Sequence, residues 1–85
     1  MIKPTIHLNG TSAGDLYEQY SAQISLLRSA VSAMANNGPN GRDYYPQGNG
    51  AIFEAMEEHN KRIGRVQRVI EELEELQAHV AERVK

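Results

Sequence analysis

The sequence predicts an all-α fold in which two antiparallel helices form a hairpin, carry a short extended N-terminal arm and assemble as a homo-oligomer. Two long segments repeat their apolar residues at steps of three and four, a Gly- and Pro-rich stretch separates them, and the 85-residue chain contains no cysteine. We expect a single domain with the arm at residues 1–12, the first helix at 13–36, the loop at 37–50 and the second helix at 51–84.

The composition is typical of a folded chain with a thin core. Hydrophobic residues make up 40% and charged residues 24% of the sequence, with no Trp and one Phe. A chain of this size buries only roughly 60–65% of the surface that its unfolded form exposes, so it is marginally stable alone. Disulfides and thiolate metal sites are excluded, and three scattered histidines do not favour a structural metal. Self-association is the remaining source of stability.

The charge and the N-terminal residues limit the possible partners. The formal net charge of −2 argues against a general nucleic-acid binder, so we expect no DNA partner. Residues 1–8 contain no long apolar run and no small-residue cleavage site. We therefore expect neither a signal peptide nor a membrane span, and the cytoplasm is the expected location.

The N-terminal arm has a short alternating pattern. Ile6 and Leu8 fall on one side of an extended segment, with His7 on the other, exposed side. Asn9-Gly10 then predicts a turn. Because no second strand pattern follows, the arm either lies on the helices or pairs with the same segment of another copy.

The first helix has clear start and stop signals. Thr11 or Ser12 is a good N-cap, and Asp15 lies three positions after Ser12, as in a capping box. The segment 36–39 (NNGP) predicts a stop with a left-handed cap at Asn or Gly. The expected apolar seam is Tyr17, Tyr20, Ile24, Leu27, Val31 and Met34, widened by Leu16, Ala30 and Ala33.

The second helix is expected to be about ten residues longer than the first. Asn49 is its expected N-cap, and Gly64 is its one weak point, at roughly 1 kcal/mol relative to Ala. At ~1.5 Å per residue, about 15 Å of apolar seam has no counterpart in the first helix. Leu73, Leu76 and Val80 are therefore predicted to need a partner from another chain. The whole seam is Ile52, Met56, His59, Ile63, Val66, Ile70 and Leu73, with Val80 and Val84 beyond it and Phe53, Val69 and Leu76 beside it.

Two blocks of charge lie on the second helix. The basic block (Lys61, Arg62, Arg65, Arg68) is either an ion-paired, solvated face or an anion-binding wall that faces a neighbour. Ion pairs of Glu57 with Lys61 and of Glu58 with Arg62 are expected at i,i+4 spacing, and Arg68 reaches Glu71 or Glu72.

The acidic run EELEE at 71–75 invites comparison with the magnesium-binding carboxylates of all-helical nucleotide pyrophosphatases. Those enzymes need carboxylates that point inward from two helices, whereas this run lies on the polar side of a single helix. We interpret it as a solvated face.

Two histidines of the second helix have simple expected roles. His59 falls on the apolar seam, where its ring needs a hydrogen-bond partner, either Tyr20 or a group of the loop. The alternative is that His59 forms the floor of a site covered by the loop. His79 follows Glu75 by four residues and is expected to form a surface pair with it.

The loop carries the residue types that hold a nucleotide-like ligand. Tyr44 and Tyr45 offer stacking surfaces, Arg42 is a planar donor for phosphate, and Asn40 and Gln47 offer hydrogen-bonding groups. The alternative is a packed loop in which the tyrosines cap the hairpin and Arg42 pairs with Asp43 or a helix carboxylate. No known phosphate-binding signature is present. The predicted ligand-binding set is Asn40, Arg42, Tyr44, Tyr45, Gln47, His59, Arg62 and Arg65.

Three segments of the chain resemble a family of short bacteriophage and prophage proteins. They are residues 5–12 (TIHLNGTS), residues 39–48 (PNGRDYYPQG) and the motif Glu58-His59-x-x-Arg62. The resemblance covers nearly the whole chain and implies a phage origin in a bacterial host cytoplasm, with no catalytic residue. In size and helical content the chain is also similar, more loosely, to oligomeric phage proteins that sequester cyclic-nucleotide signals of bacterial immunity.

These observations lead to two functional hypotheses. The first is a non-enzymatic phage protein that sequesters a small nucleotide-type signal, of the cyclic nucleotide or cyclic ADP-ribose class, in a pocket between subunits. The second is a small phage structural or protein-interaction module that binds a host or virion protein through a face of the second helix. Both predict a homo-oligomer without a metal, a cofactor or a membrane partner.

Overall fold

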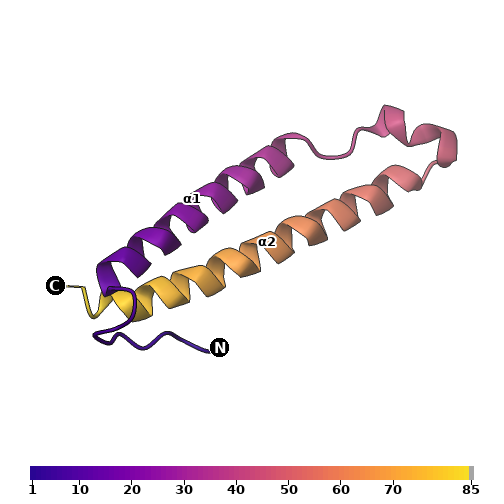
Figure 1. Cartoon of the computed structure of the whole chain (residues 1–85). Helices are drawn as coiled ribbons and strands as arrows, with labels where there is room; N and C mark the ends of the chain where they lie inside the picture. The colour runs from indigo at the N-terminus through magenta and orange to yellow at the C-terminus, as the bar shows by residue number, and fades with distance from the viewer. Residues whose placement is uncertain (85) are drawn as a thin grey trace.

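The computed structural model describes residues 1–84 and contains two long helices that lie side by side and run in opposite directions (Figure 1). Helix α1 spans Ala13–Asn36 and helix α2 spans Ala51–Ala81, with the short 3-10 turns η1 (Gly41–Asp43) and η2 (Tyr45–Gln47) between them. No strand occurs within 1–84. The prediction of an all-α chain with two helices is confirmed.

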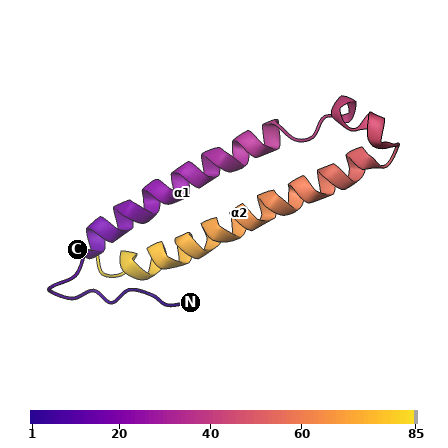
Figure 2. The same ribbon diagram turned by 45° about the vertical axis from the view of Figure 1, so that its right-hand side comes forward.

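The molecule is a narrow rod, as a turned view makes clear (Figure 2). Its principal extents are 61 × 21 × 17 Å. The loop lies at one end of the rod, and the N-terminal arm and the C-terminal end of α2 lie toward the other (Figure 1). No helix within residues 1–84 has the length and apolar character that crossing a bilayer requires.

Helix α1 begins with the predicted cap. The Ser12 side chain oxygen accepts a hydrogen bond from the Asp15 main-chain N–H at 3.1 Å. At the other end, Asn37 has φ −126° and ψ 43°, so the predicted left-handed cap is wrong. Instead, the Asn37 side-chain amide donates to the Ala33 carbonyl oxygen at 2.7 Å, which satisfies one carbonyl of the last turn.

Helix α2 begins at Ala51 as predicted but differs from its prediction in the capping residue and at its C-terminal end. Its N-cap is Gly50, which makes no side-chain hydrogen bond, so Asn49 does not cap the helix as expected. The helix ends at Ala81, three residues earlier than predicted. Residues 82–84 continue as tighter turns, in which the main-chain N–H of Arg83 donates to the Val80 carbonyl at 3.0 Å.

The core is small and is spread along the length of the rod. The buried hydrophobic residues among those described are Ala13, Ile24, Ile70 and Val80. Val80 is fully buried at 0% exposure. The prediction that Val80 needs another chain is therefore wrong, because contacts within one chain bury it, and the C-terminal end of α2 lies beside the start of α1 and close to the N-terminal arm (Figure 1). Leu73 and Leu76 remain half-buried.

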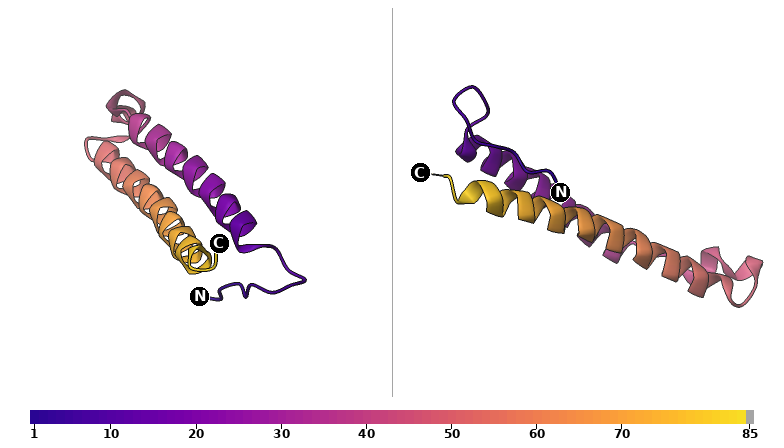
Figure 3. Two further views of the ribbon diagram at one scale, coloured as in Figure 1. Left: turned by 90° about the vertical axis from the view of Figure 1, so that its left-hand side faces the viewer. Right: turned by 90° about the horizontal axis from the view of Figure 1, so that it is seen from below.

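Within one chain, the N-terminal arm lies on the C-terminal part of α2, as in the first of the two arrangements that the sequence allows (Figure 3). Lys3 forms an ion pair with Glu75 at 3.5 Å. The ring Nε2 of His79 lies 2.8 Å from the Pro4 carbonyl oxygen. The predicted pair of Glu75 with His79 is therefore wrong, because each of these residues holds the arm instead.

The alternation predicted for the arm breaks after Ile6. Ile6 is half-buried, whereas Leu8 is 98% exposed, although both were expected on one side. The cause is a turn in which the Gly10 main-chain N–H donates to the His7 carbonyl at 3.1 Å. His7 is exposed, as expected.

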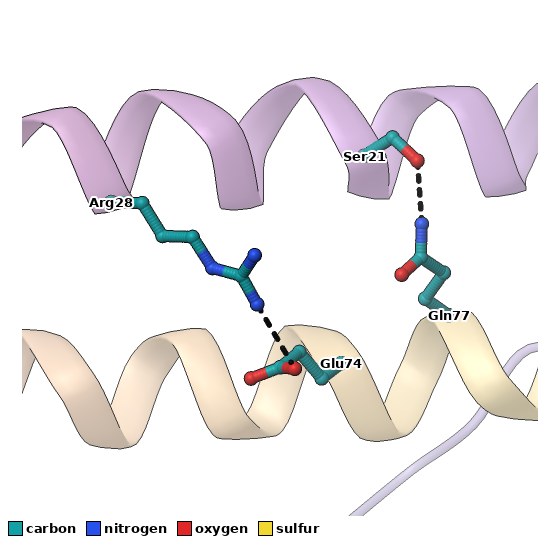
Figure 4. Close-up of polar contacts among 4 residues, drawn as sticks. All are labelled: Ser21, Arg28, Glu74 and Gln77. Carbon is teal, nitrogen blue, oxygen red and sulfur yellow. Dashed lines mark hydrogen bonds and ion pairs between the residues drawn. The ribbon is translucent and has the colours of Figure 1, made fainter.

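Two polar contacts join the helices and set their register (Figure 4). Arg28 of α1 forms a charged hydrogen bond with Glu74 of α2 at 3.2 Å. The side-chain amide of Gln77 donates to the Ser21 hydroxyl oxygen. These contacts connect residues 46 and 56 positions apart, so they specify how far one helix is offset along the other.

Candidate functional site

The loop at residues 37–50 is ordered by local hydrogen bonds. The Asn40 side-chain oxygen accepts from the Arg42 main-chain N–H at 3.1 Å and so caps η1. A second turn follows, in which the Gln47 main-chain N–H donates to the Tyr44 carbonyl at 2.9 Å. Gly48 then adopts φ +119°, which an L side chain rarely does. Asn40 therefore acts within the loop, with its acceptor oxygen already used.

Three of the predicted ligand-binding residues share one hollow at the loop end of the rod. Tyr44 and Gln47 from the loop and Arg62 from α2 line it. Its volume is about 210 Å³, below the roughly 300–1,000 Å³ of typical small-molecule pockets. Within a single chain, this hollow is too small and too open to enclose a ligand of that kind.

The charge around this hollow is mixed. Glu54 and Glu58 line it together with Arg62. The guanidinium of Arg62 lies 3.5 Å from a carboxylate oxygen of Glu58. One cation against two carboxylates does not attract an anion, so a phosphate group bound here would need further positive charge.

His59 lies apart from these three residues. Its Nε2 is 2.7 Å from the main-chain carbonyl oxygen of Met34, and the residue is half-buried. It lines a different hollow, together with Gly38, Pro39 and others. The predicted partners, Tyr20 or a loop side chain or backbone group, are wrong. His59 instead contacts a carbonyl of the last turn of α1, which also accepts a hydrogen bond from the Asn37 main-chain N–H at 3.4 Å.

The other predicted ligand residues lie on the open surface. Arg42 and Arg65 are exposed, and Tyr45 is 74% exposed. Within residues 1–84, neither arginine forms an ion pair, so the alternative pairing of Arg42 with Asp43 is absent there. Tyr44 is half-buried and packs near α2 while Tyr45 does not, so the two tyrosines do not cap the hairpin together.

The charged blocks on α2 follow the predicted pattern in part. Lys61 pairs with Glu57 at 3.2 Å and Arg62 with Glu58 at 3.5 Å, as predicted. Arg68 pairs with neither Glu71 nor Glu72 in the described part of the chain. All four glutamates of the acidic run are exposed, which agrees with a solvated face, although two of them also bind Lys3 and Arg28.

A groove between the helices was missed by the sequence reasoning. It measures about 510 Å³, is widely open, and contains the two contacts of Figure 4. Ser21, Ser25, Arg28 and Ser32 line its α1 side at steps of four, three and four. The regular helical spacing of these polar residues in the sequence was the signal that could have revealed the groove. The hydrogen bonds that join the helices cross this groove. Its polar side chains Ser21, Arg28, Glu74 and Gln77 are therefore already used in holding the two helices in register.

Comparison with other proteins adds no relative: no family model, no curated protein and no solved structure matches this chain.

Proposed function

We propose that the protein works as a homo-oligomer of helical hairpins and is a structural or protein-interaction module without catalytic activity. The observation that carries this proposal is the surface that one chain leaves exposed. It amounts to 6349 Å² for a mass of 9.5 kDa. A compact monomer of that mass exposes roughly 5,000 Å².

The excess of about 1,300 Å² is surface that association is able to cover. A specific protein–protein interface buries roughly 800 Å² on each partner. The radius of gyration leads to the same conclusion, since 18.6 Å exceeds the ~12 Å of a compact domain of this length. A rod with four buried hydrophobic residues among those described gains a core when it packs against another rod.

The exposed apolar side chains indicate which faces are covered on association. Val69 of α2 is 44% exposed, and Leu73 and Leu76 beside it are half-buried. Leu26 of α1 is 72% exposed. These residues lie outside the groove of Figure 4, so packing there leaves the joining contacts intact.

Analytical ultracentrifugation of the purified protein tests this function. We expect a mass at least twice that of the chain at micromolar concentration, and dissociation of the Leu73→Asp variant. Replacing residues 39–48 by a short Gly/Ser linker is expected to preserve the assembly. A chain that stays monomeric at hundreds of micromolar contradicts the proposal.

A second candidate is sequestration of a small nucleotide-type signal by a phage-encoded oligomer. The convergence of Tyr44, Gln47 and Arg62 on one hollow favours it, because these residues supply an aromatic face, an amide and a guanidinium. The positive charge that a phosphate needs then comes from an exposed arginine of a neighbouring subunit, Arg42 or Arg65.

Calorimetric titration with cyclic dinucleotides, cyclic trinucleotides and cyclic ADP-ribose variants tests this candidate. We expect Arg62→Ala and Tyr44→Ala to abolish the binding heat while the oligomer persists. His59→Gln serves as a matched control, since His59 lines a separate hollow. If none of the compounds produces heat with the oligomeric protein, the second candidate is excluded and the assembly proposal still stands.

A further inference from the structure

The charges in the middle of α2 are arranged in two blocks of opposite sign. Lys61, Arg62, Arg65 and Arg68 precede Val69 and Ile70, and Glu71, Glu72, Glu74 and Glu75 follow them. The outer members are used within the chain, by Glu57, Glu58, Arg28 and Lys3. The four members nearest the centre form no ion pair within residues 1–84: Arg65, Arg68, Glu71 and Glu72.

Two of these charges alternate with two apolar residues on one side of α2. Arg65, Val69, Glu72 and Leu76 follow one another at steps of four, three and four, so they share one side of the helix. We call these four residues the Val69 stripe. Glu74, which faces the groove of Figure 4, lies two residues after Glu72 and therefore points about 200° away from it. The Val69 stripe is thus free of the contacts that join α1 to α2.

The Val69 stripe is complementary to itself when two copies run in opposite directions. In an antiparallel pair centred between Arg68 and Val69, residues before the centre of one helix meet residues after the centre of the other. Arg65 then lies beside Glu72 of the second copy, and Glu72 lies beside Arg65 of the second copy. In a parallel pair, the basic blocks face each other and so do the acidic blocks, which opposes that arrangement.

We propose that a second copy of this chain docks on the Val69 stripe, with the two α2 helices antiparallel and two reciprocal contacts between Arg65 and Glu72. This inference rests on the proposed function and specifies its interface. The charge order favours a second copy as the partner. Arg65, Val69 and Glu72 follow one another as base, apolar residue and acid, so a second copy that runs in the opposite direction presents an acid to the base and a base to the acid. The excess surface of about 1,300 Å² exceeds the roughly 800 Å² that one partner contributes to a standard interface.

Charge reversal at the two positions gives a test that a general loss of stability cannot imitate. Arg65→Glu places two glutamates against each other at both contacts, and Glu72→Arg does the same with arginines. Each variant alone is expected to raise the self-dissociation constant about 10-fold or more. An equal mixture of the two variants is expected to form a one-to-one heterodimer, because every contact is then between opposite charges. Sedimentation and native mass spectrometry measure both results.

The matched control reverses an ion pair within the chain. Arg28→Glu combined with Glu74→Arg changes the same charges on the opposite side of α2, and it is expected to leave self-association unchanged. If the single variants associate as tightly as the wild type, docking on the Val69 stripe is wrong although the assembly proposal stands. If the mixture does not associate, the antiparallel pairing is wrong. A monomeric wild type overturns the proposed function itself.

Discussion

The imidazole Nε2 of His59 lies 2.7 Å from the main-chain carbonyl oxygen of Met34, and this contact ties the first part of α2 to the last turn of α1. The two residues are 25 positions apart in the sequence, so the contact closes a long segment that contains the whole loop. It adds to the hydrogen bond that the same carbonyl accepts from the Asn37 main-chain N–H at 3.4 Å.

Removing this contact is expected to destabilise the hairpin. His59→Leu leaves the Met34 carbonyl without its ring partner, at a cost of about 1 kcal/mol in the free energy of unfolding. Urea denaturation followed by circular dichroism measures the change at a fixed protein concentration. His7→Leu is the control, because His7 is exposed. Equal stability of the wild type and the His59 variant means that the contact contributes nothing.

The start of α1 offers a test with two adjacent residues. Ser12→Ala removes the oxygen that accepts from the Asp15 N–H, and we expect a loss of about 1 kcal/mol in stability. Thr11→Ala is expected to leave stability unchanged, since Ser12 is the capping residue. Thermal denaturation of both variants checks the difference. A larger effect at Thr11 than at Ser12 contradicts the cap.

Gly64 is a position where a substitution stabilises the chain. A Cβ added there meets no atom within 4 Å, and the residue lies inside α2. Gly64→Ala is therefore expected to raise the free energy of unfolding by about 1 kcal/mol. The measurement is the urea midpoint at equal protein concentration. A lower midpoint shows that Gly64 is needed for close approach of another chain, which the single chain does not reveal.

Val80 and Val84 provide a matched pair near the end of the chain. Val80 is 0% exposed and Val84 is 46% exposed. Val80→Ala removes two buried methyl groups and is expected to lower the free energy of unfolding by about 2 kcal/mol. Val84→Ala is expected to lower it by about 0.5 kcal/mol or less. Chemical denaturation distinguishes them. Similar losses for both variants indicate that Val84 is covered in the assembled protein.

The sequence predicted those parts of the fold that depend on neighbouring residues. The range of α1, from Ala13 to Asn36, follows from Ser12 before it and the NNGP segment after it. The pairs Glu57–Lys61 and Glu58–Arg62 follow from helical spacing alone. In each case the signal and its consequence lie within one or two turns of chain.

The parts that were missed depend on contacts between distant residues. Nothing near His79 in the sequence indicates that it binds the Pro4 carbonyl, 75 positions away. The burial of Val80 likewise depends on where the opposite end of the chain lies. The predicted ligand-binding residues are separated for the same reason. Tyr44 and His59 were predicted to share one site, but they line different hollows.

The direction of the chain within the rod has a practical meaning. The N-terminal arm folds back along the C-terminal part of α2, while the tyrosine-bearing loop lies at the far end of a body 61 Å long. A label, tag or fused domain attached at either terminus is therefore expected to lie in the half of the rod away from that loop. Such an attachment is expected to leave the loop exposed.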